Sequence, residues 1–140
     1  MRPGSKIALL VLILLIVAGG VAGLYLFNLK PKDLQKVKPD YVIASSDLLK
    51  AFEDDEAAAA AKYVGKIVEV SGEIGTLTSG EGNTVNIALK TGSDFSSVIC
   101  TLPEGSALGN AGAGMQVAIR GECSGYLMDV LLKNCVIISK

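Results

Sequence analysis

Residues 115–139, MQVAIRGECSGYLMDVLLKNCVIIS, contain two apolar runs separated by a short turn, and this stretch decides the fold. Val117, Ile119 and Cys123 alternate with other residues in the first run, which predicts a half-buried strand with these side chains facing inward. The second run follows a turn predicted at 125–127, so the stretch predicts a β-hairpin. It also holds two of the three cysteines, whose role bears on the choice between an enzyme and a binding module.

Three segments upstream of this hairpin have the pattern of β-strands. They are KIVEVSGEIGTLT (66–78), TVNIALK (84–90) and SSVICTL (96–102). Gly72 and Gly75 in the first segment predict a bend or bulge. Three strands, a Gly-rich connector and two more strands are the order of a small closed barrel, and closure removes the strand edges that promote aggregation.

A helix is expected over residues 45–64, immediately before the first of these strands. Ser45 or Ser46 can cap its start, and Gly65 is placed to end it. Its apolar side chains can share one face: Leu48, Leu49, Phe52 and Ala59. The acidic run 54–56 lacks the spacing of a cation site, so we expect it to be a solvated face.

The N-terminal region is expected to cross a membrane. Residues 7–27, IALLVLILLIVAGGVAGLYLF, contain no charge, and as a helix they would span about 31 Å, close to the thickness of a bilayer core. We divide the chain into a basic tail (1–6), a transmembrane anchor (7–27), a linker (28–44) and a globular domain (45–140). The apolar run exceeds the usual length of a cleaved signal, which favours a retained single-pass signal-anchor over a removed signal.

Two arguments about membrane orientation conflict. Four lysines follow the span and two basic residues precede it: Lys30, Lys32, Lys36 and Lys38 against Arg2 and Lys6. The positive-inside rule would keep the domain in the cytoplasm, whereas a signal-anchor with a short basic tail commonly sends the domain behind it across the membrane. We favour export, with the anchor in a bacterial inner membrane and the domain outside the cytoplasm. The lysine cluster would then contact anionic lipid headgroups.

The domain is acidic although the whole chain is close to neutral. From Asp40 onward there are seven Lys or Arg residues and thirteen Asp or Glu residues, so the domain carries about −6 while the whole chain carries −1. Phosphate backbones attract proteins of the opposite charge, so this balance argues against nucleic acid as the partner.

The residue types that commonly carry catalysis are scarce. The chain has no histidine, which removes the commonest general base and the commonest nitrogen ligand of zinc. The gaps between Cys100, Cys123 and Cys135 do not form the short knuckles of a structural zinc site. We therefore expect no catalytic residue, no metal and no cofactor.

The cysteines are then expected to be structural. In a barrel of this strand order the last strand lies between the third and fourth, so Cys135 can approach either Cys100 or Cys123. Simple hairpin pairing places Cys135 opposite residue 118, so a bond to Cys123 would require a shift or bulge. Outside the cytoplasm we expect one disulfide, from Cys135 to Cys123 or Cys100, and inside it three buried thiols.

Four segments resemble a family of small bacterial OB-fold proteins named for similarity to tRNA-anticodon-binding domains. They are AKYVGKIVEVSGEI (61–74), VNIAL (85–89), VIC (98–100) and VAIRGECSGYLMDVLLKNCVI (117–137). The resemblance implies a mainly β chain, in which a five-stranded OB-fold barrel is preceded by an α-helix and by an N-terminal transmembrane helix. Members of the family are typically small, exported or tethered to a membrane, and of uncharacterised function. Its name implies nucleic-acid binding by fold analogy alone.

OB-folds usually hold ligands on the face formed by the second and third strands and the adjacent loops. Candidate ligand-binding residues there are Lys90, Phe95, Arg120 and Tyr126, although Phe95 would equally suit a partly buried turn and Arg120 an outward-facing sheet position. A single-stranded nucleic acid needs more aromatic platforms and a basic groove. We therefore expect a non-catalytic, membrane-anchored binding module for a protein, peptide or glycan at the cell envelope. The alternative is an OB-fold protein that binds single-stranded oligonucleotides.

Overall fold

The computed structural model describes residues 3–27 and 33–139, which belong to two separate units. The first unit contains α1 (Pro3–Phe27), a single helix that exposes its large apolar side chains. Within it, Gly4–Leu26 is long and apolar enough to cross a membrane, and a signal sequence has the same properties. The helix begins at Pro3 rather than at Ile7, and proline suits the first helical position because its missing N–H would have no partner there.

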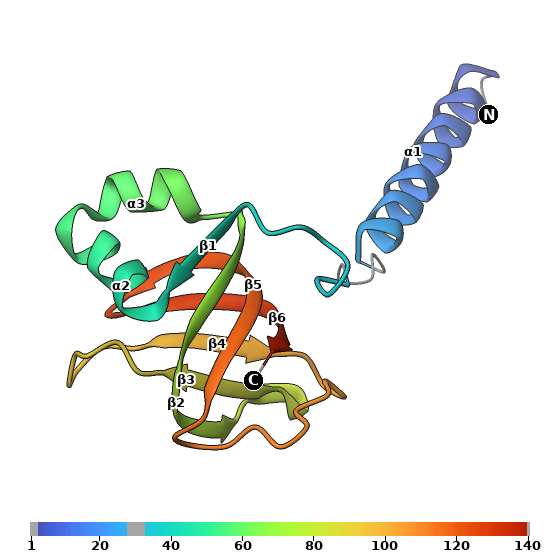
Figure 1. Cartoon of the computed structure of the whole chain (residues 1–140). Coiled ribbons are helices and arrows are strands. Elements are labelled where there is room, and N and C mark those ends of the chain that lie inside the picture. The colour runs from blue at the N-terminus through green and yellow to red at the C-terminus, as the bar shows by residue number, and fades with distance from the viewer. Residues whose placement is uncertain (1–2, 28–32, 140) are drawn as a thin grey trace. The chain divides into compact units, whose positions relative to one another are not determined.

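The second unit is the predicted OB-fold, a closed five-stranded barrel (Figure 1). Its strands are β2 (Ile67–Ser79), β3 (Val85–Leu89), β4 (Val98–Leu102), β5 (Gln116–Leu127) and β6 (Asp129–Ser139). β6 lies between β4 and β5, as predicted, and pairs parallel with β4 and antiparallel with β5. Pairing of β2 with β5 closes the barrel. A short 3-10 helix, η1 (Glu81–Asn83), connects β2 to β3.

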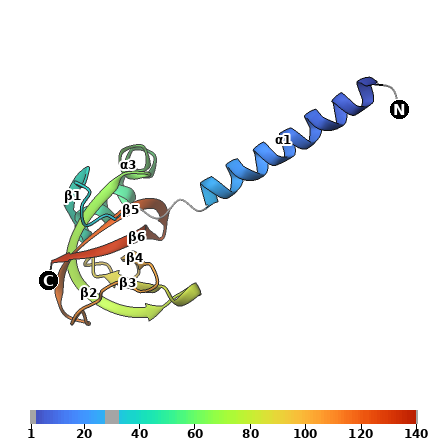
Figure 2. The same ribbon diagram turned by 90° about the vertical axis from the view of Figure 1, so that its right-hand side faces the viewer.

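The barrel core follows from the alternation of apolar residues along the strands. Val68, Val70 and Ile74 of β2 are fully buried, and β4 and most of β5 also bury every second residue. β2 pairs with β5 over residues 67–73 and with β3 from Ile74 onward, and its register shifts at Gly75. This bulge confirms the predicted bend and lets one long strand curve around the barrel (Figure 2).

The helix predicted over 45–64 is two helices, α2 (Ser45–Asp54) and α3 (Glu56–Tyr63), so the prediction of one continuous helix is wrong. Asp55 separates them in an extended conformation, and its carboxylate accepts a hydrogen bond of 3.1 Å from the backbone N–H of Ala58. Aspartate is favoured just before a helix, where its carboxylate accepts hydrogen bonds from free backbone N–H groups, and is less favoured inside a helix. The acidic run 54–56 is exposed, as predicted.

The prediction that Ser45 or Ser46 caps α2 is wrong. The residue before the helix is Ala44, which provides no side-chain cap, whereas the Ser45 hydroxyl is buried and donates a 2.6 Å hydrogen bond to the carbonyl oxygen of Lys90. The expected apolar face is correct, because Leu48, Leu49, Phe52 and Ala59 are all buried. Gly65 follows α3 with a positive φ of 80°, which suits the predicted helix end.

The linker predicted over 28–44 extends too far toward the domain. Residues 28–32, including Lys30 and Lys32, lie outside the described residues. Leu34 is buried, and β1 (Tyr41–Ala44) pairs in parallel with Val68–Ser71 of β2. The globular unit therefore includes residues 33–44, and the boundary predicted at 45 is wrong. A four-residue strand next to Pro39 is too short to give a clear alternation in the sequence.

The β5–β6 turn lies at Met128, just beyond the predicted 125–127, because Leu127 pairs with Asp129. Three register shifts interrupt this hairpin, and Ala118 pairs with Ser139 rather than with Cys135. Cys135 instead packs against Gly121, where a side-chain carbon would overlap its sulfur atom. The simple register expected for Cys135 is therefore wrong, because bulges displace the two strands relative to each other.

Candidate ligand-binding face

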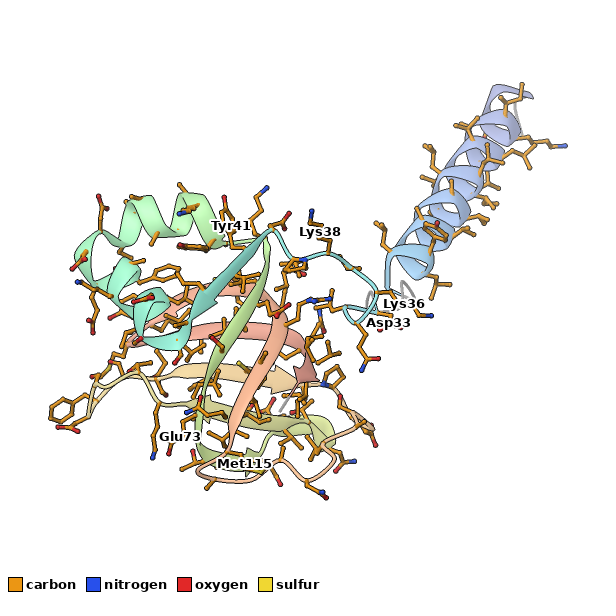
Figure 3. All side chains as sticks on the ribbon, viewed as in Figure 1. Asp33, Lys36, Lys38, Tyr41, Glu73 and Met115 are labelled. Atoms are coloured by element: carbon orange, nitrogen blue, oxygen red, sulfur yellow. The ribbon has the colours of Figure 1, made fainter. Side chains whose placement is uncertain are left out.

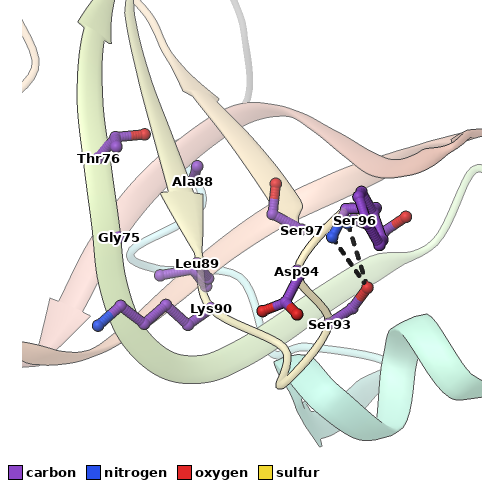
Figure 4. Close-up of a pocket in the computed structure, with 10 residues that line it drawn as sticks. Gly75, Thr76, Ala88, Leu89, Lys90, Ser93, Asp94, Ser96 and Ser97 are labelled. Atoms are coloured by element: carbon purple, nitrogen blue, oxygen red, sulfur yellow. Dashed lines mark hydrogen bonds between the residues drawn. The ribbon is translucent and has the colours of Figure 1, made fainter.

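A shallow cavity of about 250 Å³ lies where β2, β3 and the loop of residues 90–97 meet. Gly75 and Thr76 of β2 and Ala88 and Leu89 of β3 form one side of this cavity (Figure 4). The loop that connects β3 to β4 forms the other side. The cavity shares β3 and the β3–β4 loop with the predicted ligand-binding face, but its other strand is β2, the first strand of the barrel, and not β4, the third.

Hydrogen bonds within the loop of residues 90–97 fix its conformation. The hydroxyl of Thr91 donates to the carbonyl oxygen of Ser96 at 2.6 Å. The hydroxyl oxygen of Ser93 accepts from the backbone N–H groups of Phe95 and Ser96, both at 3.3 Å (Figure 4). At the end of the loop, the N–H of Ser97 donates to the Asp129 carboxylate at 2.7 Å. Because these bonds already order the loop, the loop would lose less conformational entropy when a ligand binds.

Phe95 and Lys90, two of the four predicted residues, both line this cavity. Phe95 is 87% exposed, so the interpretation of a partly buried turn residue is wrong. The Lys90 ammonium lies 2.6 Å from a carboxylate oxygen of Glu73, and this ion pair leaves most of the lysine side chain exposed. Figure 3 shows where Glu73 lies on the barrel. The face thus offers one exposed aromatic ring and one cation whose charge is balanced nearby.

Arg120, in contrast, belongs to a structural contact away from this cavity. Its guanidinium donates two hydrogen bonds to one Glu69 carboxylate oxygen, at 2.7 and 3.2 Å. It also donates to the carbonyl oxygens of Leu34 and Val37, at 2.9 and 2.6 Å. The side chain of Arg120 is only 12% exposed. Arg120 therefore fastens the segment that precedes β1 to the barrel rather than facing a ligand.

Tyr126 also lies apart from the cavity. Its ring stacks on that of Phe52, with centroids 5.5 Å apart, and it packs against the core beneath α2. A second aromatic contact joins Phe52 to Tyr63 of α3. Tyr126 therefore helps attach the helices to the barrel, and the structure brings together only Lys90 and Phe95 of the four predicted residues.

The three cysteines are free and buried in this structure. The thiol of Cys135 lies close enough to the thiol of Cys100 for Cys100 to influence the ionisation of Cys135. Burial, together with the Cys100 thiol, raises the pKa of Cys135 well above its usual value, and burial also raises the pKa of Cys123. Thiols that are buried and hard to ionise are poor nucleophiles. Within residues 3–27 and 33–139, no group of three potential ligands could hold a metal ion.

Sequence reasoning missed two exposed apolar side chains, Leu127 and Met128, at the β5–β6 turn. The backbone N–H of Val130 donates to the carbonyl oxygen of Ser97 at 3.1 Å, so this turn lies next to the end of the β3–β4 loop. The only signal in the sequence was that two apolar residues, Leu127 and Met128, lie at and just beyond the end of the predicted turn. It gave no information about the neighbouring loop, because residues 97 and 130 meet only when the barrel closes.

Known proteins share the fold. The chain belongs to the tRNA_anti-like family, which it matches over residues 1–137, and this confirms the resemblance seen in the sequence. A crystal structure of a lipoprotein from Klebsiella pneumoniae, provisionally named as nucleic acid-binding, covers 79% of this chain and 100% of its own, with 17% identity and a TM-score of 0.58. At that identity the likeness shows the fold alone.

A more distant structural match is an aspartyl-tRNA synthetase from Leishmania major, also provisionally named. The match covers 88% of this chain and 26% of the synthetase chain, with 12% identity and a TM-score of 0.46. No curated protein matches the chain.

Proposed function

We propose that this protein is a non-catalytic binding module, tethered to a membrane by α1, that binds a protein, peptide or glycan at the cell envelope. The exposed ring of Phe95 carries this proposal, because the hydrogen-bonded loop of residues 90–97 holds it out beside a shallow cavity. Aromatic rings bury a large apolar area when a partner covers them, and aromatic anchors often contribute much of the binding energy of an interface.

The chemistry of the cavity supports binding rather than catalysis. Lys90 and Asp94 are the ionisable side chains among the described residues that line it, and Lys90 is paired with Glu73. General acid–base catalysis uses a group whose pKa is tuned by burial or by a neighbouring charge. The two cysteines with raised pKa values are buried in the barrel interior and do not line the cavity.

Crosslinking from position 95 in intact cells tests this proposal. A photoreactive benzophenone amino acid replaces Phe95 in the full chain, and the matched control carries it at Val42, which is also exposed but lies on β1. We expect a discrete adduct at position 95 that protease or glycan-degrading enzymes remove, and none at position 42. Equal labelling at both positions, or no adduct at position 95, would contradict a binding face there.

Binding of single-stranded nucleic acid is the second candidate function. The Klebsiella lipoprotein with the same fold is provisionally named as nucleic acid-binding, and Phe95 beside Lys90 combines an aromatic ring with a cation. Fluorescence anisotropy with a labelled oligothymidylate of about 16 nucleotides tests it. Salt-sensitive binding that Phe95→Ala and Lys90→Gln each weaken would favour this function, whereas the charge of about −6 leads us to expect no saturable binding.

We also propose that α1 is a retained anchor in a bacterial inner membrane and that the barrel lies outside the cytoplasm. The apolar length of α1 supports its retention as an anchor, and the short basic tail before it is the argument for export. Alkaline phosphatase fused after Lys140 tests the orientation, since this enzyme is active only where its disulfides form. We expect an active fusion that sediments with membranes. An inactive fusion, with activity from a cytoplasmic reporter at the same position, would place the barrel inside the cell.

A further inference from the structure

Three exposed apolar side chains lie at the same end of the barrel. Phe95 is 87% exposed in the β3–β4 loop, and Leu127 and Met128 are 78% and 69% exposed at the β5–β6 turn. The two segments enter β4 and β6, which run parallel with Val98 paired to Val130. Figure 1 shows both loops projecting from the same end of the barrel, below α2.

Hydrogen bonds hold the two loops together. The Asp129 carboxylate accepts from both the N–H and the hydroxyl of Ser97, at 2.7 and 3.1 Å. The N–H of Val130 donates to the carbonyl oxygen of the same serine at 3.1 Å. Ser97 and Asp129 therefore join the two loops. Phe95 precedes Ser97 by two residues and Met128 precedes Asp129 directly, so both side chains are carried by these connected loops.

Met128 occupies a turn position whose backbone conformation is unfavourable for methionine. Among the described residues, three other than glycine have positive φ: Asn83, Asn134 and Met128. Asparagine tolerates this conformation, whereas methionine is disfavoured in it. A residue in a disfavoured conformation at an exposed turn leads to the hypothesis that its side chain has a role there.

Acidic side chains border this end of the barrel. Asp94 precedes Phe95 in the loop. Asp47, Glu53 and Asp54 of α2 line a shallow depression together with Thr91, Gly92 and Ser93 of the same loop. Lys50 is the single cation among the residues that line this depression. The apolar cluster thus has a negatively charged border, which would repel nucleic acid and anionic lipid and attract a cationic partner.

We propose that Phe95, Leu127 and Met128 form the docking surface for a peptide segment of a partner protein that carries a large apolar side chain next to lysine or arginine. This inference rests on the proposed binding function and specifies its partner. Apolar side chains of the segment would contact the cluster, and methionine and aromatic residues suit such contacts because they pack adaptably. The basic side chains would lie against Asp94 and the acidic side chains of α2.

A displayed library of random peptides tests this inference. The full chain is held in nanodiscs of neutral phosphatidylcholine, so that basic peptides do not bind the lipid. We expect selected peptides to combine a large apolar residue with adjacent lysine or arginine. The affinity of one selected peptide is then measured for the natural chain and for Phe95→Ser, Leu127→Ser and Met128→Asn, the last of which keeps a residue suited to positive φ.

We expect Phe95→Ser, Leu127→Ser and Met128→Asn each to raise the Kd about tenfold or more. Val42→Ser, the matched control for an exposed apolar side chain, should leave the Kd unchanged. Asp94→Asn should raise the Kd less, and its effect should disappear in high salt. Circular dichroism of each variant separates lost contacts from lost folding.

Three results would overturn the inference. Selection of acidic or purely polar peptides would contradict the partner's chemistry. Binding that survives both Phe95→Ser and Met128→Asn would place the peptide elsewhere and overturn the inference, whereas an adduct from position 95 in cells would still support the proposed binding function. Failure to select any peptide, together with no adduct from position 95 in cells, would remove both the inference and the proposed function.

Discussion

At the scale of single residues, Arg120 connects three parts of the domain. It joins β5 to Glu69 of β2 and to the carbonyl oxygens of Leu34 and Val37. Because the ion pair is mostly buried, it is screened less than a surface pair, and removal of the guanidinium would leave Glu69 without its partner.

We predict that Arg120→Met lowers the free energy of unfolding by about 2 kcal/mol, measured by urea denaturation of the full chain in mild detergent. Trypsin should also cleave more readily after Lys36, since the segment that contains it loses its attachment, whereas the bond between Lys38 and Pro39 resists trypsin in both proteins. Lys133→Met is the control, because Lys133 and Glu122 form a more exposed pair and its loss should cost less than about 1 kcal/mol. Equal effects of the two variants would contradict the structural role of Arg120.

The buried thiols give a second prediction at this scale. The pKa of Cys123 and that of Cys135 are raised above 9.0 in the folded protein, mainly by burial. The unfolded chain therefore releases these protons at lower pH than the folded chain. Their contribution to stability is complete below about pH 9 and is lost as the pH rises from there toward the folded pKa values.

We expect the free energy of unfolding to fall as the pH rises above about 9, and to fall less in the double variant Cys123→Val, Cys135→Val. Urea titrations at several pH values would measure this difference. The same slope in both proteins would mean that other groups, and not these thiols, determine the alkaline loss of stability.

At the scale of elements, the approach of β6 to β5 depends on Gly121. A side-chain carbon at this position would overlap the Cys135 sulfur and would lie 3.2 Å from the carbonyl oxygen of Lys133. The hairpin shifts register on both sides of this contact. Close packing of β6 against β5 therefore requires a glycine opposite a cysteine.

We predict that Gly121→Ala lowers the free energy of unfolding by about 2 kcal/mol, because it overpacks the barrel. Cys135→Ala should relieve part of the overlap, so that the double variant is more stable than the sum of the single changes predicts, by about 1 kcal/mol. If the changes in the free energy of unfolding are strictly additive, the side chains at positions 121 and 135 are not in contact across the hairpin.

The helical region shows how much of an element a local pattern can reveal. The apolar positions Leu48, Leu49, Phe52 and Ala59 were identified correctly, since burial follows their helical spacing. The break at Asp55 was missed because a single aspartate is compatible with a helix surface. Only the packing of Phe52 and Tyr63 into one core requires the chain to change direction there.

At the scale of the whole molecule, the barrel and α1 are separate units, and the barrel includes residues before the predicted boundary. Leu34 is buried against the barrel unit, and β1 extends its sheet beside β2. A chain beginning at residue 32 retains both features, whereas a chain beginning at residue 45 has neither.

We predict that residues 32–140 unfold in urea at the same midpoint as the full chain. Residues 45–140 should lose more than about 3 kcal/mol, because the burial of Leu34 and the pairing of β1 are both removed. A lower midpoint for 32–140 would show that the barrel needs α1, and an unchanged midpoint for 45–140 would restore the boundary predicted from the sequence.

The number and spacing of the strands in the sequence predicted their order in a small closed barrel. The sequence by itself also determined the five barrel strands and the inward orientation of Cys123, because the period of apolar residues reports local burial directly. It also determined the apolar N-terminal helix and the acidic character of the domain. The tertiary structure decided which candidates form a site. Arg120 meets Leu34 across 86 residues and Ser97 meets Asp129 across 32. No local pattern encodes such contacts, because they depend on where barrel closure and the bulges place each side chain.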